Sequence, residues 1–473
     1  MNLSEYPRPQ NDLGIGFSYF PDNNHFNQRD LDCWLPRLRE LGASWLVLQT
    51  PVARPVPDSF LQQLMMGDVE PVVVLTAERV GPLDLPSLTD TVHALADSGA
   101  HYVVLGDQPN SRSRWTPQEW AKPAVVERFV DYMVPALETV AAEGLFPVLP
   151  PLDPFGAYWD TSFLQTMLAS LVRRGLGPLL ERASIGMRNF ANHRPLDWGV
   201  GGRKAWPQCR PYACDDGTQD HRGFRLFEWY LEIVRESVGR ELPIIACANG
   251  PQDSRGDDDR PLDQRKHADQ SVEMVNLLAN GELPPAVLNH AFWVLSAERS
   301  QAGYAERWFD PNGKPRLLAV QAVQNAAAEL RLRPAASQDA YRQVVAGRVT
   351  EDDQGVGPAG GVTSHSKGKL IQHYLLLPVF EWGVEPWYLE IAQDYVAAHR
   401  PTCGFSLDEA VLAQRVTIVG NEQGISADAA RVLETAGCRV ERIAGKDGTE
   451  TRNLLGKLAR NARPIWAAQT QRS

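Results

Sequence analysis

Eight short apolar runs recur along the first two thirds of the chain, and each is separated from the next by a stretch with helical periodicity. The runs cover residues 13–20, 45–50, 70–75, 101–106, 146–152, 183–190, 243–250 and 287–295. Their apolar residues are continuous rather than alternating, which indicates strands buried on both faces of a parallel sheet. Eight consecutive strand–helix units favour a closed (β/α)8 barrel over an open doubly wound sheet, which usually has fewer strands.

The rest of the chain adds a second, smaller domain. We assign residues 1–335 to the barrel and residues 336–368, which are polar and rich in glycine, to a linker. Residues 369–473 form a small α/β domain, in which we expect strands at 373–380, 415–420 and 438–444 and helices at 387–398, 426–436 and 449–459. The predicted fold class is therefore α/β: a TIM barrel with a smaller α/β domain.

Charge and composition exclude several functions. The chain has 47 Lys and Arg against 58 Asp and Glu, a net charge of −11, and no basic block that would follow a phosphate backbone. Nucleic acid is therefore not an expected partner. The first residues contain no basic region followed by an apolar run, and no segment approaches about 18 uninterrupted apolar residues. We expect no membrane span and, from the missing signal peptide, a cytoplasmic location.

The six cysteines indicate neither a disulfide scaffold nor a zinc site, because they are widely spread and lack paired spacing with histidines. No metal or cofactor is predicted. Cys209 and Cys214, which share one long loop, would form a disulfide if the chain is exported and would otherwise stay as two thiols.

Aromatic and polar residues gather where the predicted strands end. In TIM barrels the functional site lies at the carboxyl ends of the strands. Rings beside amides suit a saccharide, whose C–H faces stack on rings while its hydroxyls form hydrogen bonds. We therefore predict an oligosaccharide or polysaccharide as the partner. The predicted binding residues are Tyr19, Gln108, Asn110, Trp159, Asn192, His193, Asn249 and Trp293.

Two of these strands resemble those of clan A glycoside hydrolases. HYVVLGDQPN, residues 101–110, is similar to their fourth strand, which ends in Asn-Glu-Pro and carries the acid/base glutamate. ELPIIACANG, residues 241–250, resembles their nucleophile strand, and Trp293 falls where that clan often has a tryptophan under the sugar. The resemblance covers residues 10–333, including a similar closing segment at 306–321, and implies a barrel that binds carbohydrate.

The chain departs from the clan at both catalytic positions, which hold Gln108 and Ala248. Retaining hydrolysis needs two carboxyl groups about 5 Å apart, and neither an amide nor a methyl group can replace them. Our main prediction is a carbohydrate-binding pseudoenzyme. One alternative is an active glycoside hydrolase with relocated carboxylates, Asp107 and Asp153 above all, with Asp22 and Asp160 as the other strand-end acids. The other alternative is a structural or cell-envelope assembly module.

Residues 416–459 resemble a single cell-wall-binding type 2 repeat. Arg442, Gly445, Asp447 and Thr451 match the pattern of that repeat, whereas Gly448 stands where the repeat usually has an arginine. The resemblance implies a bacterial surface location, the alternative to the cytoplasmic one.

Overall fold

The computed structural model describes residues 2–215, 217–252, 263–332, 369, 371–379, 386–422 and 424–460. Internal contacts divide the chain into two compact units. The first unit comprises Met1–Arg114, Val130–Trp206 and Gln219–Ala359, and the second comprises Trp115–Phe129, Pro207–Thr218 and Gly360–Ser473. The predicted linker, 336–368, lies outside the described residues, so the proposed domain bounds stay a prediction.

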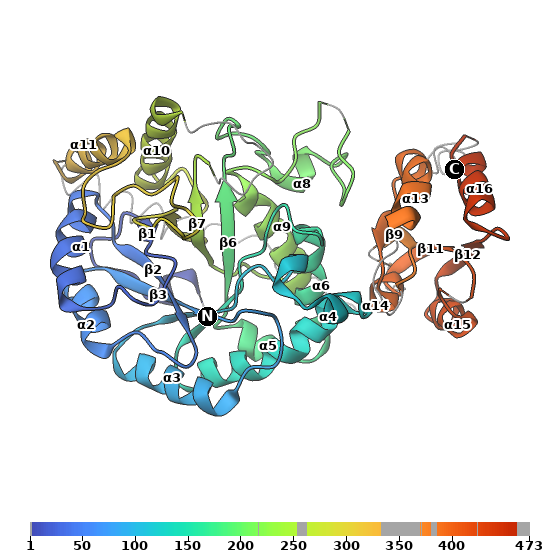
Figure 1. Cartoon of the computed structure of the whole chain (residues 1–473), viewed down its shortest axis with the longest axis horizontal. Coiled ribbons are helices and arrows are strands. Elements are labelled where there is room, and N and C mark those ends of the chain that lie inside the picture. Colours follow the sequence, from blue (N-terminus) through green and yellow to red (C-terminus); the bar gives the residue numbers. More distant parts are fainter. Residues whose placement is uncertain are drawn as a thin grey trace, which may run out of the picture. The chain divides into compact units, whose positions relative to one another are not determined.

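Eight parallel strands close into a barrel, which confirms the predicted fold (Figure 1). Each strand pairs with the next in sequence, and the last pairs with the first. Every strand coincides with one of the eight apolar runs. The strands are β1 Ile15–Ser18, β2 Trp45–Pro51, β3 Glu70–Thr76, β4 Tyr102–Leu105, β5 Phe146–Leu149, β6 Ser184–Phe190, β7 Ile244–Gly250 and β8 Val287–Phe292.

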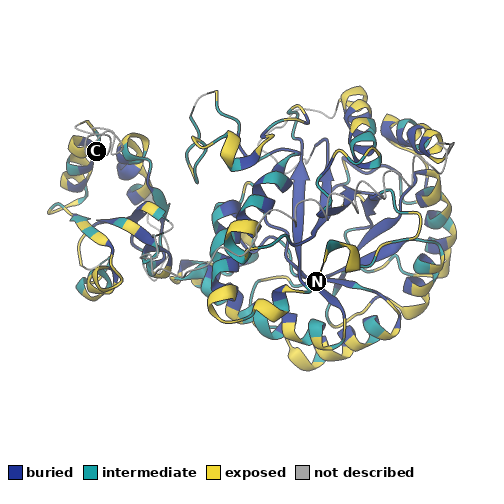
Figure 2. Cartoon of the chain, turned by 180° about the vertical axis from the view of Figure 1, so that it is seen from behind, coloured by how far each residue is buried: buried dark blue, intermediate teal, exposed yellow. Residues whose placement is uncertain are grey.

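Helices surround the barrel, and their outward faces carry the exposed residues, while the strands are buried (Figure 2). None of the helices in the described part of the chain is long and apolar enough to cross a bilayer. The longer helices are α1 Gln28–Glu40, α2 Asp58–Met66, α3 Leu85–Asp97, α5 Val125–Ala142, α6 Asp160–Arg173, α9 Leu226–Val238, α10 Gln264–Ala279 and α11 Leu318–Leu332. The shorter ones are η1 Leu3–Glu5, η2 Arg112–Arg114, α4 Pro117–Ala121, α7 Gly177–Leu180 and α8 Gly202–Ala205.

Side chains fill the barrel, so it is a packed core rather than a pore. Large rings from the first residues of three strands, Trp45, Tyr102 and Phe146, pack together at its amino-terminal end. Tyr6 closes this end: its ring lies 5.3 Å from that of Phe146, and its hydroxyl donates to the carbonyl oxygen of Ala183. Described side chains thus fill the amino-terminal end, and a ligand site is expected at the opposite end, where the strands finish.

The second unit contains a four-stranded parallel sheet in the order β10-β9-β11-β12. The predicted strands and helices are confirmed, but β10 was missed because it has only three residues and an unremarkable sequence. Two apolar clusters cover the two faces of the sheet. Its elements are β9 Ile371–Leu376, α13 Pro386–His399, β10 Thr402–Gly404, α14 Leu407–Ala410, β11 Ala413–Val419, α15 Ala427–Thr435, β12 Arg439–Ile443 and α16 Gly448–Arg460.

Candidate functional site

The loops at the carboxyl end of the barrel, which we call the mouth, contain strained backbone. Gln108 follows β4 with a φ of 54°, and Asn192 and His193 follow β6 with φ values of 49° and 65°. This left-handed region is unfavourable for residues other than glycine, and such strain is concentrated at functional sites. The sequence predicted that these three residues contact the ligand, because they follow strand ends. The backbone strain is thus found at residues that were already candidates for binding.

An arginine that the sequence analysis missed lies at the floor of the mouth. Arg188, in β6, is 5% exposed, and its guanidinium carbon lies 5.6 Å from the ring centroids of both Phe190 and Trp293. Its Nη1 is 3.9 Å from Oδ1 of Asp107. The signal was present in the sequence, because a charged residue inside an otherwise apolar strand needs a partner or a function.

Asp107 has an unusual electrostatic environment. Burial raises the pKa of its carboxyl group, and Asp153 adds to the increase, while Arg188 and Arg114 oppose it. The net effect is a pKa above the ordinary value. Asp107 therefore holds its proton to a higher pH than an exposed aspartate does.

Ala248, to which the sequence resemblance assigns the nucleophile position, lies in an apolar cluster. Ala248 packs with Phe190 and Trp293, the two rings that flank Arg188. Trp293 is only 5% exposed, and Gly303 lies so close that a Cβ there would come within 2.8 Å of the indole Nε1. In this conformation the ring offers a ligand little surface, and its predicted role in stacking stays a prediction.

Asn110 holds a loop in place. Its Nδ2 donates to the carbonyl oxygens of Asp153 and Tyr158, at 2.7 and 2.9 Å, and its Oδ1 accepts from the backbone nitrogen of Asp153. The residue is fully buried. We predicted that Asn110 binds the ligand, but in the structure its amide secures the loop that follows β5.

The other three strand-end aspartates are engaged within the chain. Asp153 accepts from the hydroxyl of Ser111 and from the backbone nitrogen of Phe155. Burial alone would raise the pKa of Asp22, but hydrogen bonds from His25, the backbone of Asn24 and Gln301 lower it. Asp160 is fully buried and accepts from the hydroxyl of Tyr230. Asp107, in contrast, has a raised pKa and a partly exposed side chain.

Tyr19 does not line the mouth in this structure. It is 1% exposed and packs among aromatic rings that include Phe20, Trp34 of α1 and Phe60 of α2. Burial raises the pKa of its hydroxyl, which has no hydrogen-bond partner among the described residues. The predicted contact between Tyr19 and a sugar does not fit this buried position, because its side chain packs against α1 and α2.

The remaining predicted residues lie at the mouth. Asn249 is fully buried at the end of β7, and its carbonyl oxygen accepts from the backbone nitrogen of Trp293. Nζ of Lys266 donates to the carbonyl oxygen of His193. Trp159 is half-buried, and the guanidinium of Arg222 lies over its ring. Arg222 was not singled out from the sequence, because no strand or motif marks its position in a long loop.

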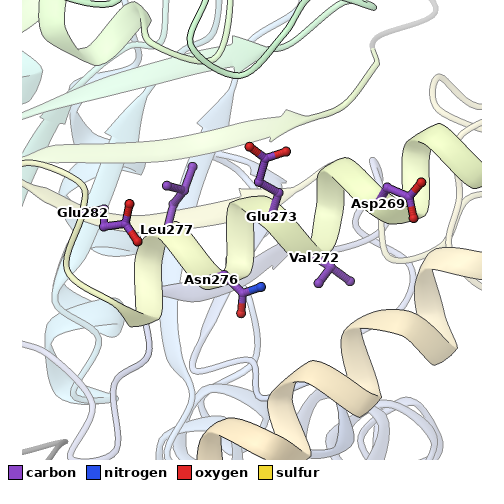
Figure 3. Close-up of a pocket in the computed structure, with 6 residues that line it drawn as sticks. All are labelled: Asp269, Val272, Glu273, Asn276, Leu277 and Glu282. Atoms are coloured by element: carbon purple, nitrogen blue, oxygen red, sulfur yellow. The ribbon is translucent and has the colours of Figure 1, made fainter.

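A surface pocket of about 390 Å³ lies away from the mouth. Figure 3 shows its lining on α10 and the turn that follows this helix. The six residues are Asp269, Val272, Glu273, Asn276, Leu277 and Glu282. Asp269, Glu273 and Glu282 are exposed to solvent.

Within the described part of the chain, no group of three or more His, Cys, Asp or Glu residues is arranged to hold a metal ion. The structure pairs Cys209 with Cys214 in a disulfide, one of the two alternatives considered above.

In the second unit, residues that match the cell-wall-binding repeat contact one another or the nearby backbone. Arg442 donates to the carbonyl oxygen of Gly420. The hydroxyl of Thr451 accepts from the backbone nitrogen of Gly445 and donates to the carbonyl oxygen of Asp447. These contacts join the ends of β11 and β12 to the start of α16. Arg442, Gly445, Asp447 and Thr451 therefore have a structural role in this fold, whether or not the unit binds a cell wall.

The departure from that repeat also has a physical reason. Gly448 is the first residue of α16, and a Cβ at this position would lie 3.1 Å from the ring of Trp387. An arginine would require this ring to shift by a few tenths of an ångström. The likeness to the repeat therefore stays a prediction.

No protein-family model matches the chain, and no curated protein matches it. Solved structures with similar folds include a family 39 glycoside hydrolase from Bacteroides cellulosilyticus WH2, with 11% identity, a TM-score of 0.45, and coverage of 69% of this chain and 66% of that one. A GH128 endo-β-1,3-glucanase from Sorangium cellulosum has 15% identity, a TM-score of 0.38, and coverage of 66% and 97%. A GH128 oligosaccharide-binding protein from Trichoderma gamsii has 14% identity, a TM-score of 0.37, and coverage of 70% and 100%.

These structural neighbours are thus glycoside hydrolases and an oligosaccharide-binding protein. Less than two thirds of the family 39 chain is matched. At such identities and TM-scores the comparisons do not decide what the mouth binds.

Proposed function

We propose that the barrel is a carbohydrate-binding, glycoside hydrolase-like pseudoenzyme that binds an oligosaccharide or polysaccharide at its mouth. The observation that carries the proposal is the composition of the mouth. Aromatic rings, a buried guanidinium and strained strand ends gather there. By the sequence resemblance, Gln108 and Ala248 stand at the positions at which the clan has its two glutamates.

The contacts of the strand-end aspartates favour binding over hydrolysis. Glycosidases of both stereochemical outcomes use two carboxyl groups, one of which donates a proton while the other attacks the sugar or activates water. Asp22 and Asp153 accept hydrogen bonds from neighbouring groups, and Asp160 is buried. The side chain of Asp107 is partly exposed, and its pKa is raised.

One observation favours a second candidate, an active glycoside hydrolase. A general acid must keep its proton near the working pH, and burial raises the pKa of Asp107 in that direction. Asp153 is near enough to raise the pKa further. In this alternative, Asp107 protonates the leaving oxygen and Asp153 is the second carboxylate.

Paired binding and product assays on the full chain distinguish the two candidates. The purified protein is incubated with neutral and acidic polysaccharides, saturation is followed by calorimetry, and new reducing ends are measured. We expect saturable binding without new reducing ends. Release of reducing ends that disappears in both Asp107→Asn and Asp153→Asn would establish the hydrolase instead, whereas failure to bind any glycan would reject both.

A further inference from the structure

Two loops of the mouth are joined by a buried contact between residues that lie beside exposed ones. Asp160 and His221 both have fully buried side chains, with Oδ1 and Nε2 2.6 Å apart. Asp160 directly follows Trp159, and His221 directly precedes Arg222. The contact therefore fixes Trp159, from the loop after β5, relative to Arg222, from the loop after β6.

The outer side of this junction is a stack of rings and a guanidinium. The guanidinium carbon of Arg222 lies 5.4 Å from the ring centroid of Trp159 and 5.4 Å from that of Phe155. Phe155 is 40% exposed, and the side chain of Arg222 is 30% exposed. The imidazole of His221 lies behind Trp159, with ring centroids 4.9 Å apart. One face of the stack is thus supported from within while the other meets solvent.

On the outer side of this junction, two arginines contact one carboxylate. Asp220 contacts two arginines: its Oδ1 accepts from Arg194, and its Oδ2 accepts from Nε of Arg222 at 2.8 Å. Burial alone would raise the pKa of Asp220, but these guanidiniums, with the indole N–H of Trp198, lower it to about 2. In this outer group one carboxylate, that of Asp220, therefore pairs with two guanidiniums, those of Arg194 and Arg222, so the group has one positive charge in excess.

Both guanidiniums have donors left for a ligand. Within the described residues, the side chain of Arg222 donates only to Asp220, and that of Arg194 donates only to Asp220 and to the carbonyl oxygen of Arg222. Each guanidinium has five N–H donors. The remaining N–H groups lie on partly exposed side chains, where an anion can reach them.

We infer that Phe155, Trp159, Arg194, Asp220 and Arg222, here called the rim cluster, form a subsite for an anionic sugar residue of the bound glycan. The inference rests on the proposed function and narrows its ligand to a saccharide with carboxylate or sulfate groups. The anionic group pairs with the outer N–H groups of the two arginines, since guanidinium forks match such anions. The exposed ring of Phe155 contacts the apolar face of the sugar.

Asp160 and His221 are positioning residues in this arrangement. They are too deeply buried to touch a ligand, but their contact holds the backbone next to Trp159 and next to Arg222 in place. Loss of the contact should release Arg222 from the ring of Trp159. Preference for acidic glycans should then fall, while binding of neutral glycans deeper in the mouth persists.

The test compares matched ligands on the full chain. Oligogalacturonate is titrated beside its fully methyl-esterified form, which keeps the same sugar and linkage without the charge, and a sulfated galactan oligosaccharide forms a third arm. We expect the wild-type protein to bind at least one of the anionic ligands about fivefold to tenfold more tightly than the neutral one, with the advantage shrinking as salt is added. The arm with the larger advantage identifies carboxylate or sulfate as the natural group.

Variants separate the rim cluster from general charge effects. Arg222→Gln should abolish the advantage, and Arg222→Lys should restore part of it. Arg203→Gln is the matched control, because Arg203 belongs to the same loop but pairs with Glu236 on the surface; it should change nothing. His221→Gln and Asp160→Asn should reduce the advantage. If these buried variants fail to fold, the Arg222 variants carry the test.

Neutral binding without an anionic advantage in the wild type would overturn the inference and leave the proposed function intact. An advantage that survives in Arg222→Gln would also overturn it. If no glycan binds, charged or neutral, the proposed function fails and the inference fails with it.

Discussion

Asp107 and Arg188 face each other at the floor of the barrel mouth, with Oδ1 and Nη1 3.9 Å apart. The distance exceeds that of a direct hydrogen bond. The guanidinium of Arg188 therefore lowers the pKa of Asp107 only in part, and burial keeps that pKa above its ordinary value. The raised pKa of Asp107 means that its contribution to stability is complete below its unfolded pKa and is lost as the pH rises through the folded value.

This relationship predicts a pH-dependent effect of Arg188→Gln. Without the guanidinium, ionisation of Asp107 becomes costlier, so the variant should lose about 3 °C or more of Tm at neutral pH and less near pH 4. Calorimetry at several pH values measures the difference. In the double variant with Asp107→Asn the pH dependence should vanish; if it persists, another group is responsible.

Glu409 predicts a second dependence on pH, in the smaller sheet unit. Burial, with a smaller contribution from Glu127, raises its pKa to about 8, and the hydroxyl of Tyr374 donates to its carboxyl group at 2.7 Å. Stability should therefore fall as the pH rises from the unfolded pKa to about 8, by on the order of 5 kcal/mol, and level off above that pH. Glu409→Gln should remove this loss in thermal melts from about pH 5 to pH 9. Identical melts for both proteins would contradict the assignment.

The loop role of Asn110 predicts a change in stability rather than a local loss of ligand contacts. Asn110→Ala removes the hydrogen-bond partners of the backbone nitrogen of Asp153 and of the carbonyl oxygen of Tyr158, both part-buried, which should cost about 1–3 kcal/mol in urea unfolding. Asn280→Ala, at an exposed position, is the control and should change stability little. A neutral result for Asn110→Ala would show that water replaces the amide.

Tyr19→Phe should be neutral or slightly stabilising, by up to about 1 kcal/mol, because the buried hydroxyl has no hydrogen-bond partner in the described structure. Glycan affinity should not change. A clear loss of affinity would restore Tyr19 to the ligand-binding residues and require the loop after β1 to open.

The combined variant Gln108→Glu and Ala248→Glu tests the alignment with clan A hydrolases. If the strand ends correspond, the two new carboxyl groups approach retaining distance, and slow release of reducing ends should appear. Each single variant should stay inactive. A folded double variant without product would count against this correspondence.

The barrel was predictable because continuous apolar runs report burial on both faces, and the eight runs coincide with the eight strands. The sequence did not predict the direction in which side chains point beyond the strand ends. Tyr19 comes directly after β1, where alternation no longer applies, and its ring points between helices. The partners of Arg222 come from a different loop, so no spacing along the chain could reveal them.

The clamp made by Asn110 has a practical consequence for studies of this barrel. It consists of an amide and backbone groups, none of which gains or loses a proton under ordinary assay conditions. Acid or alkali should therefore leave this clamp itself unaltered. Any variation of ligand affinity with acidity should accordingly arise elsewhere, in the titratable side chains of the mouth and its loops or in the saccharide itself.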